Sequence, residues 1–221
     1  MKEPYLYLSL IPGAERYPHL AYLWVVMALL LVVAYLSTRR LQLLPSGGQG
    51  MMELVVEGLL GFMERVMGHH ARQHLPIIGG IALLIVTSNL LGIIPGLFSP
   101  TVNINVTAGC AITIFLYYHS IGFRRHGIAY LKQFTGPVWW LAPLMLPIEL
   151  ISHFIRPFTL ALRLFANMRG HEIVLIIITL LVPVIAPLVI VLQGIFVSFI
   201  QGFVFILLSM IYIAGAEEEH H

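Results

Sequence analysis

The feature that most constrains this chain is a set of long apolar segments without a single Asp, Glu, Lys or Arg. They are Leu20–Leu36, Leu75–Leu97, Ile104–Ile121 and Pro187–Ile213. An α-helix needs about 20 apolar residues to cross the hydrocarbon core of a bilayer. With 59% hydrophobic and 10% charged residues, the chain also has too little polar surface to cover a water-facing globule. We therefore expect an all-α, polytopic membrane protein in a lipid bilayer.

A fifth apolar segment, Val138–Val182, differs from the others because it carries charge: Glu149, Arg156, Arg163, Arg169 and Glu172. As one helix of about 45 residues it would be roughly twice as long as a hydrocarbon core of about 30 Å is thick. It must therefore tilt strongly or break at one of its prolines, which are Pro143, Pro147 and Pro157. Pro183 and Pro187 indicate a tight reversal before the last segment. We expect five transmembrane crossings that end in a long, tilted C-terminal helical hairpin.

The stretch Met51–Met67 predicts an amphipathic helix. Its charged residues follow one narrow helical stripe, and Leu, Val, Phe and Met occupy the rest of its surface; the charged residues are Glu53, Glu57, Glu64 and Arg65. We expect this helix to lie on the inner membrane surface, either as a simple connector or as a docking site for a partner subunit.

These segments divide one integral membrane domain, residues 1–221. The first segment (1–50) holds an N-terminal outer stretch, the first span and a cytoplasmic loop. It is followed by the amphipathic interfacial helix (51–72), a transmembrane hairpin (75–122) and a cytoplasmic loop (123–137). The tilted hairpin with the ion path (138–213) and an acidic tail (214–221) complete it.

The positive-inside rule predicts the orientation of the chain. Seven basic residues fall in the loops after the first and third spans, against Lys2 and Arg16 on the opposite side; the seven are Arg39, Arg40, Arg65, Arg72, Arg124, Arg125 and Lys132. We expect the N-terminus outside and the acidic Glu217–Glu219 tail in the cytoplasm.

Several function classes are disfavoured by the composition. The net charge is only +2, and no basic run with interleaved aromatic residues indicates a nucleic-acid partner. Cys110 is the single cysteine, so the chain has no internal disulfide and no CxxC site. No GxxxxGK[ST] loop indicates nucleotide binding. We expect no cofactor and no catalytic chemistry of the chain's own.

Three histidines, His69, His70 and His74, have a spacing that suits a metal, but no carboxylate or cysteine completes the set. We expect no metal site and interpret them as interface residues. Asn89, Asn103 and Asn105 are expected to satisfy backbone and helix-end groups at the outer surface.

Arg163 is the residue most difficult to explain by packing alone. An arginine within a spanning helix costs from about 3 to more than 10 kcal/mol, so it persists only where partners or water compensate. Its guanidinium does not deprotonate, which suits a fixed electrostatic gate and excludes a proton relay. The alternative is a structural ion pair with Glu149 or Glu172.

Polar residues recur every three or four positions around Arg163, at Glu149, His153, Arg156, Asn167 and His171. Glu172, nine residues after Arg163, falls on the opposite side of the helix, so two separate aqueous access routes are indicated. Glu149 and Glu172 are either members of a proton pathway or counter-charges for Arg156 and Arg169. His171, which titrates near physiological pH, is a candidate for proton access.

On the last segment, Gly194, Ser198 and Gln201 share one face that can meet the Arg163 stripe across the hairpin. Gln201 can hydrogen-bond a guanidinium without neutralising it, or it can simply join two helices.

The stretch Pro147–Met168, with its core Arg163-Leu-Phe-Ala-Asn-Met168, closely resembles the family of bacterial ATP synthase subunit a. Thr87–Gly96, Asn103–Thr107 and the last segment with Gln201 extend the resemblance over most of the chain from about Met51 onward.

The resemblance implies roles for individual residues. Arg163 matches the family's essential arginine, which faces the ion-binding carboxylate of the c-subunit ring and separates two proton half-channels. Asn167 and Gln201 match its polar neighbours. Glu172 matches a carboxylate of the outward-facing half-channel, and Glu149 an acidic position nearer the cytoplasm.

This chain departs from its relatives at two positions. Some relatives carry a histidine on the last helix at the position of Gly194. This chain instead has a histidine, His171, on the neighbouring helix. A family aspartate in the outer loop is replaced by Asn103.

The resemblance also implies partners and a location. The partners are the c-subunit ring, the b-subunit peripheral stalk and the remaining ATP synthase subunits. The location is the bacterial plasma (inner) membrane.

Two other function classes compete with a proton channel. A secondary transporter usually has internal repeats, and none is found here. An intramembrane hydrolase would use Ser198 or Ser209 with His153 or His171, but no GxSxG motif accompanies them.

Overall fold

The computed structural model describes residues 17–39, 42, 47–94, 97–127, 130, 142–182 and 185–217. Within these ranges the chain is all-helical: α1 (Pro18–Thr38), α2 (Gly48–Met67), η2 (Gly68–His70), α3 (Ala71–Leu91), η3 (Pro100–Val102), α4 (Ile104–His126), α5 (Ala142–Leu181) and α6 (Ile185–Glu217). Five of these helices, α1, α3, α4, α5 and α6, are long and apolar enough to cross a membrane. The expected all-α, polytopic architecture is confirmed.

Some predictions concern residues outside the described ranges. Among them are most of the N-terminal segment and part of the 123–137 loop, together with Lys2, Arg16, Arg40, Lys132, Pro183, Glu218, Glu219 and the two histidines that follow. The orientation of the chain and its division into segments therefore stay predictions.

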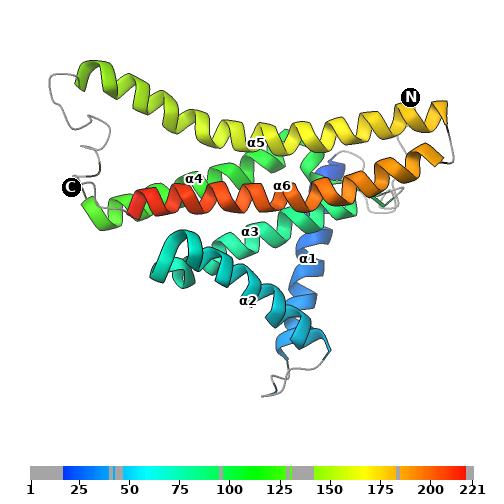
Figure 1. Cartoon of the computed structure of the whole chain (residues 1–221), viewed down its shortest axis with the longest axis horizontal. Coiled ribbons are helices and arrows are strands. Elements are labelled where there is room, and N and C mark those ends of the chain that lie inside the picture. Colours follow the sequence, from blue (N-terminus) through cyan, green and yellow to red (C-terminus); the bar gives the residue numbers. More distant parts are fainter. Residues whose placement is uncertain are drawn as a thin grey trace.

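The charged segment forms one unbroken helix, α5, although Pro147 and Pro157 lie inside it. Its 40 residues extend over about 60 Å, against about 30 Å for a hydrocarbon core. The structure thus decides between the two expectations: the helix does not break, and it must tilt in the membrane. The 21-residue α1, about 30 Å long, crosses the long axes of α5 and α6 steeply (Figure 1).

Local signals explain where two of the helices end. Gly68 and Gly127 follow α2 and α4 with φ of 65° and 55°, a left-handed conformation that favours glycine. Their N–H groups donate to the carbonyl oxygens of Glu64 and Phe123, respectively. At the start of α4, the Asn103 side chain accepts a hydrogen bond from the Asn105 N–H, as expected for a helix-end residue.

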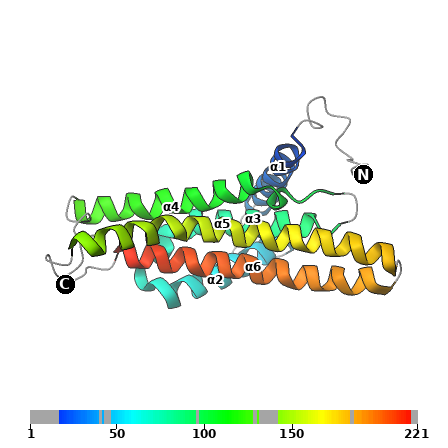
Figure 2. The ribbon, with the colours of Figure 1, turned by 90° about the horizontal axis from the view of Figure 1, so that it is seen from above.

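The long helices α5 and α6 run side by side along the molecule (Figures 1 and 2). The helix α4 packs along α5, and α3 packs along α6. The buried core lies where these four helices meet α2, and its largest fully buried members include Met63, Ile78, Ile85, Ile114, Leu164, Phe205 and Met210. At Gly202 a Cβ atom would lie 2.4 Å from Val86, so the glycine permits the close approach of α6 to α3.

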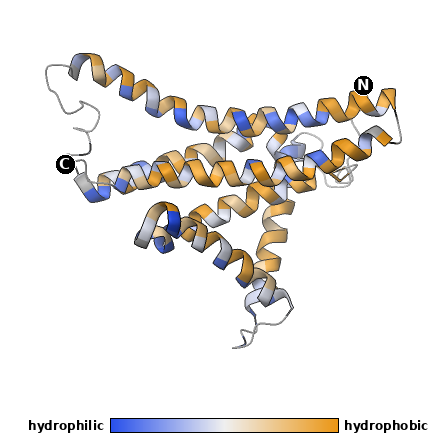
Figure 3. Cartoon of the chain, viewed as in Figure 1, coloured by the Kyte–Doolittle hydropathy of each residue, from blue (hydrophilic) through white to orange (hydrophobic). Residues whose placement is uncertain are grey.

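The predicted amphipathic helix is present as α2, which packs on α3 and α6. The rings of Phe62 and Phe203 join α2 to α6 with centroids 4.8 Å apart. Apolar colour dominates α1 and α6 in Figure 3, whereas polar positions interrupt α5 along its length. The charged helix α5 therefore packs against the strongly apolar α6 on one side and against α4 on another.

Candidate functional site

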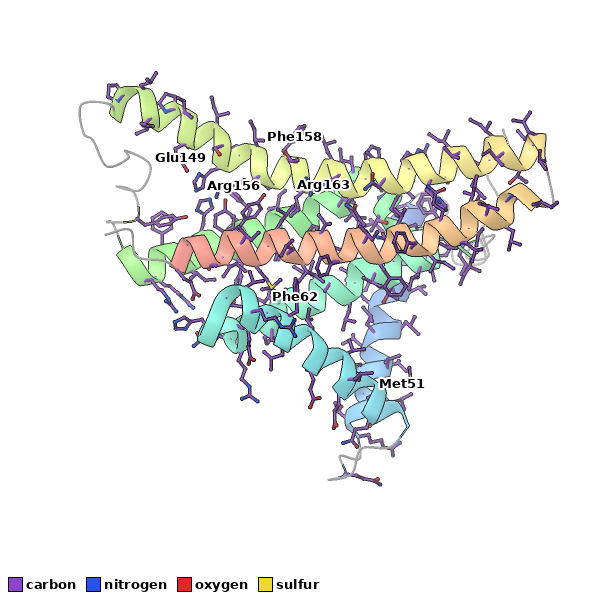
Figure 4. The ribbon with its side chains drawn as sticks, in the orientation of Figure 1. Met51, Phe62, Glu149, Arg156, Phe158 and Arg163 are labelled. Carbon is purple, nitrogen blue, oxygen red and sulfur yellow. The ribbon has the colours of Figure 1, made fainter. Side chains whose placement is uncertain are left out.

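Arg163 lies near the middle of α5 and is half-buried. Its neighbours Leu160 and Leu164 are buried in the core, so the helix packs through the turns on both sides of the arginine. Figure 4 shows Glu149, Arg156 and Arg163 along the side of α5 toward α6, with Phe158 on the other side.

Within the part of the chain that the structure describes, no carboxylate lies within ion-pair distance of Arg163. Glu149 contacts His153 instead, and Glu172 pairs with Arg169, whose Nη1 atom lies 2.9 Å from Oε2. The alternative of a structural ion pair between Arg163 and Glu149 or Glu172 is therefore not realised.

One turn beyond Arg163, the two hairpin helices are joined by a hydrogen bond between polar side chains. The Asn167 Nδ2 donates to Gln201 Oε1 at 2.6 Å, and Gln201 is only 4% exposed. The expected meeting of the Gln201 face with the Arg163 stripe is thus observed. This bond fixes the register of α6 against α5 next to the arginine.

His171 occupies space that a side chain at position 194 would otherwise fill. A Cβ atom built on Gly194 would lie 2.5 Å from both Cε1 and Nε2 of the His171 ring. The missing side chain on α6 and the imidazole on α5 therefore complement each other. The Nε2 atom of His171 is buried without a hydrogen-bond partner among the described residues.

A small pocket of about 50 Å³ opens beside His171 and Glu172, a volume that can hold a few water molecules. Asn89 of α3 lines this pocket, and so does Ser99, which lies in the segment that leads to η3. The Nδ2 atom of Asn89 is also buried without a partner in the described structure. The pocket is thus lined by the polar side chains of Asn89, Ser99, His171 and Glu172, as a water-accessible site requires.

The expectation for Asn89 was wrong, because this residue caps no helix. It is fully buried, and its Oδ1 accepts a hydrogen bond of 2.7 Å from the Thr101 hydroxyl. The Ser99 hydroxyl lies 2.7 Å from Thr101 and donates to the Ser88 carbonyl oxygen. Ser99 and Thr101 were missed by sequence reasoning, since hydroxyl residues in a connecting segment carry no helical periodicity that would mark them.

A second polar group lies toward the other end of α5. The Nδ1 atom of His153 lies 3.0 Å from the Glu149 carbonyl oxygen, and the imidazole stacks on His119 of α4. His119 Nδ1 in turn lies 3.0 Å from the Tyr130 hydroxyl. Burial raises the pKa of Tyr130, with a smaller opposing effect from Arg156, so its phenol stays neutral.

His119 was also missed by sequence reasoning. It lies in the segment Ile104–Ile121, which has no Asp, Glu, Lys or Arg. Because ionisable side chains are rare within a membrane span, the presence of a histidine there was the signal that could have found it.

His70, at the end of η2, and His74 of α3 contact other parts of the chain, and their interpretation as interface residues stays a prediction. His74 is buried, with Nδ1 2.9 Å from the Tyr117 hydroxyl and Nε2 3.2 Å from the Glu217 carboxylate. His70 contacts Arg125 at 3.3 Å. No cluster of three metal-ligating side chains occurs among the described residues.

The serines considered for hydrolysis are engaged with their own helix. Ser198 donates to the Gly194 carbonyl oxygen, and Ser209 donates to that of Phe205, both at 2.8 Å. Both are buried, and within the described residues neither hydroxyl contacts a histidine. In the described part of the chain, neither Ser198 nor Ser209 is therefore activated by a base.

Comparisons with known proteins agree with the resemblance read from the sequence. The family model described as "ATP synthase A chain" matches residues 20–214. "ATP synthase subunit a" of Trichlorobacter lovleyi is 52% identical over 200 residues, covering 90% of this chain and 87% of the relative. "ATP synthase subunit a" of Geobacter sulfurreducens is 49% identical over 202 residues, covering 91% and 88%.

"ATP synthase subunit a 3" of Pelobacter propionicus is 47% identical and covers both chains completely. Because the family model matches most of the chain and these relatives cover nearly all of it, the chain belongs to the ATP synthase A chain family.

Proposed function

We propose that this protein is the proton-channel subunit of an F-type ATP synthase and that Arg163 separates two proton half-channels beside the c-subunit ring. The observation that carries the proposal is the guanidinium of Arg163, half-buried in a membrane helix and without a carboxylate partner among the described residues. Such a charge needs compensation, and a carboxylate of the rotor ring supplies it.

Two separate polar groups on either side of Arg163 support two half-channels. Glu172 lies nine residues along α5 and Glu149 fourteen residues in the other direction, which correspond to about 14 Å and 21 Å along a helix. The pocket with His171 and Asn89 adjoins Glu172 and suits the outward-facing route. The partly exposed Glu149 beside His153 suits the inward-facing route.

Electrostatics couples proton movement to rotation. A rotor carboxylate that carries a proton can face lipid, whereas an ionised one would incur a large desolvation cost. Protons enter one half-channel, protonate a ring carboxylate, travel nearly a full turn and leave through the other half-channel where Arg163 favours the ionised form. Each charge that crosses releases about 2.3 kcal/mol per 100 mV.

The Asn167–Gln201 bond holds α5 and α6 together beside the arginine. Its role here is to fix the position of the guanidinium relative to the ring and to keep a polar surface next to it.

The proposal extends to the assembly and to the orientation of the chain. The exposed apolar surface of α5, which includes Ile151, Ile155 and Phe158, suits contact with lipid. The b-subunit peripheral stalk and the remaining subunits complete the complex. The charge distribution of the sequence favours the N-terminus outside and the C-terminus in the cytoplasm of a bacterial inner membrane.

The test is ATP-driven proton pumping, together with passive proton leak, in inside-out vesicles that carry Arg163→Ala. Pumping is expected to be lost. Arg72→Ala, which removes an exposed arginine at the start of α3, serves as the matched control and is expected to pump normally. Normal pumping by assembled Arg163→Ala complexes would refute the proposed function of this arginine.

A further inference from the structure

Burial in the first half of α5 is concentrated in one side chain. From residue 143 to residue 159, a range that the structure describes throughout, His153 is the only buried residue. Apolar residues on both sides of it, such as Ile151 and Ile155, are exposed. Figure 1 shows this part of α5 diverging from α6. The imidazole of His153 is therefore the one buried contact that holds the first half of α5 against the other helices.

The imidazole of His153 joins α5 to α4. Its Nδ1 atom lies 3.0 Å from the backbone carbonyl oxygen of Glu149, one turn earlier in the same helix. A carbonyl oxygen only accepts hydrogen bonds, so Nδ1 carries the hydrogen and the ring is fixed to its own helix. The same ring stacks on His119 of α4, with centroids 5.6 Å apart and planes at 30°. A displacement of the His119 ring therefore moves the contact on which the first half of α5 depends.

His119 is in turn held by Tyr130. The Tyr130 hydroxyl lies 3.0 Å from Nδ1 of His119, and the two rings meet edge to face with centroids 5.8 Å apart. Tyr130 lies beyond the end of α4, and it is only 3% exposed. These contacts fix the rotation of the His119 ring about its side-chain bonds.

Gly122 makes room for the Tyr130 ring. A Cβ atom at position 122 would lie within 2.8 Å of three atoms of that ring, whereas ordinary contact begins at 3.4 Å. The Phe123 ring lies against Tyr130 as well, with centroids 5.1 Å apart. The absent side chain at Gly122 and the ring of Tyr130 complement each other, so α4 itself provides the notch that receives the tyrosine.

We propose that Tyr130 is a positioning residue of the inward-facing proton route. Seated at Gly122, Tyr130 fixes the His119 ring, and His119 fixes His153 by stacking. His153 then fixes the first half of α5, which carries Glu149. We call Tyr130, His119 and His153 the Tyr130 clasp. The inference rests on the proposed function, in which Glu149 belongs to the inward-facing route.

The first experiment measures the position of α5 directly and needs no activity. Spin labels are attached to Leu116→Cys on α4 and Leu150→Cys on α5 in the purified complex, and their distance distribution is recorded by double electron–electron resonance. Both positions are exposed, whereas the native Cys110 is buried, so the labels attach to the introduced cysteines. A second pair, Leu116→Cys with Val174→Cys, reports on the other half of α5 and serves as the control.

Tyr130→Ala removes both the ring and the hydroxyl, and Tyr130→Leu is the second variant if the first does not assemble. We expect a second, longer distance between the first pair of labels, absent from the unaltered complex or about tenfold less populated there, because an aromatic contact and a hydrogen bond together bias an equilibrium by roughly that factor. Tyr130→Phe keeps the ring at Gly122 and is expected to retain a single distance. The control pair is expected to stay unchanged in every variant.

Gly122→Ala tests the notch. The added methyl group displaces the Tyr130 ring, so this variant is expected to show the same second distance as Tyr130→Ala. In the Tyr130→Ala background the methyl group no longer meets the ring, and Gly122→Ala is expected to add nothing.

The second experiment measures the initial rate of ATP-driven pumping per assembled complex. Tyr130→Ala and Gly122→Ala are expected to lose pumping in proportion to the fraction of complexes that show the second distance, and Tyr130→Phe is expected to retain most of the rate. In a His153→Ala background, Tyr130→Ala is expected to change neither the distance nor the rate further, because its effect passes through that imidazole.

Each contrary result has a distinct meaning. A single, unchanged distance in Tyr130→Ala would overturn the inference, as would equal broadening for the control pair, which would assign the effect to a general loosening of the helices. An effect of Gly122→Ala that is the same with and without the Tyr130 ring would refute the notch. Normal pumping by variants that show the second distance would remove Tyr130 from the proton route. The Arg163→Ala experiment decides the proposed function independently, since the distance measurement does not depend on pumping.

Discussion

The contact between Gly194 and His171 supports a quantitative prediction about how α5 and α6 fit together. A Cβ atom at position 194 would lie 2.5 Å from two atoms of the imidazole, whereas ordinary contact begins at 3.4 Å. In Gly194→Ala the ring must therefore move by about 1 Å, away from a site where it fits the facing helix. Overpacking of this kind costs about 1–3 kcal/mol.

The assay is a double-mutant cycle on the purified complex. Thermal stability of the membrane sector and ATP-driven pumping are measured for Gly194→Ala, His171→Ala and the double variant. Gly194→Ala alone is expected to lower both. In the His171→Ala background the added methyl group meets open space and should cost less than about 0.5 kcal/mol. Equal costs in the two backgrounds would refute the assignment of the Gly194 requirement to the imidazole.

Two further predictions concern contacts that join distant helices. Glu217→Ala removes the acceptor shared by His74 and Arg125, and it is expected to destabilise the contact between the start of α3 and the end of α6 by about 1–3 kcal/mol, measured by thermal unfolding. An unchanged unfolding midpoint would contradict a stabilising role for this carboxylate. Gln201→Leu leaves the Asn167 amide without its acceptor; we expect slower pumping with little loss of assembled complex. Pumping at the unaltered rate would contradict a role for this hydrogen bond.

Much of the fold was predictable because the bilayer restricts it. Apolar segments of spanning length fix the number and approximate bounds of the crossing helices, since backbone groups in lipid must hydrogen-bond internally. The choice between tilting and breaking was not predictable. Pro147 and Pro157 each remove a backbone hydrogen bond, whether the helix breaks there or continues. Only packing against α4 and α6 decided that α5 continues past both prolines.

The candidate site divides in the same way. Arg163 was identified from the cost of a charge in an apolar helix, and the Arg169–Glu172 pair from a spacing of three residues. Helical periodicity shows which residues share a face of one helix, but it does not show which face of another helix they meet. The Asn89–Thr101 bond and the stack of His119 on His153 were therefore not predictable.

The sequence by itself determined the membrane environment, the helical class, the exceptional arginine and the family to which its motifs belong. These properties depend on composition and on local spacing along a single helix. The tertiary structure decided which polar groups meet: the imidazole of His171 against Gly194, the Glu217 carboxylate between His74 and Arg125, and the absence of a carboxylate partner for Arg163 within the described chain. The physical reason is that the rotation and register of packed helices are set jointly by many side chains far apart in sequence, and no local pattern encodes them.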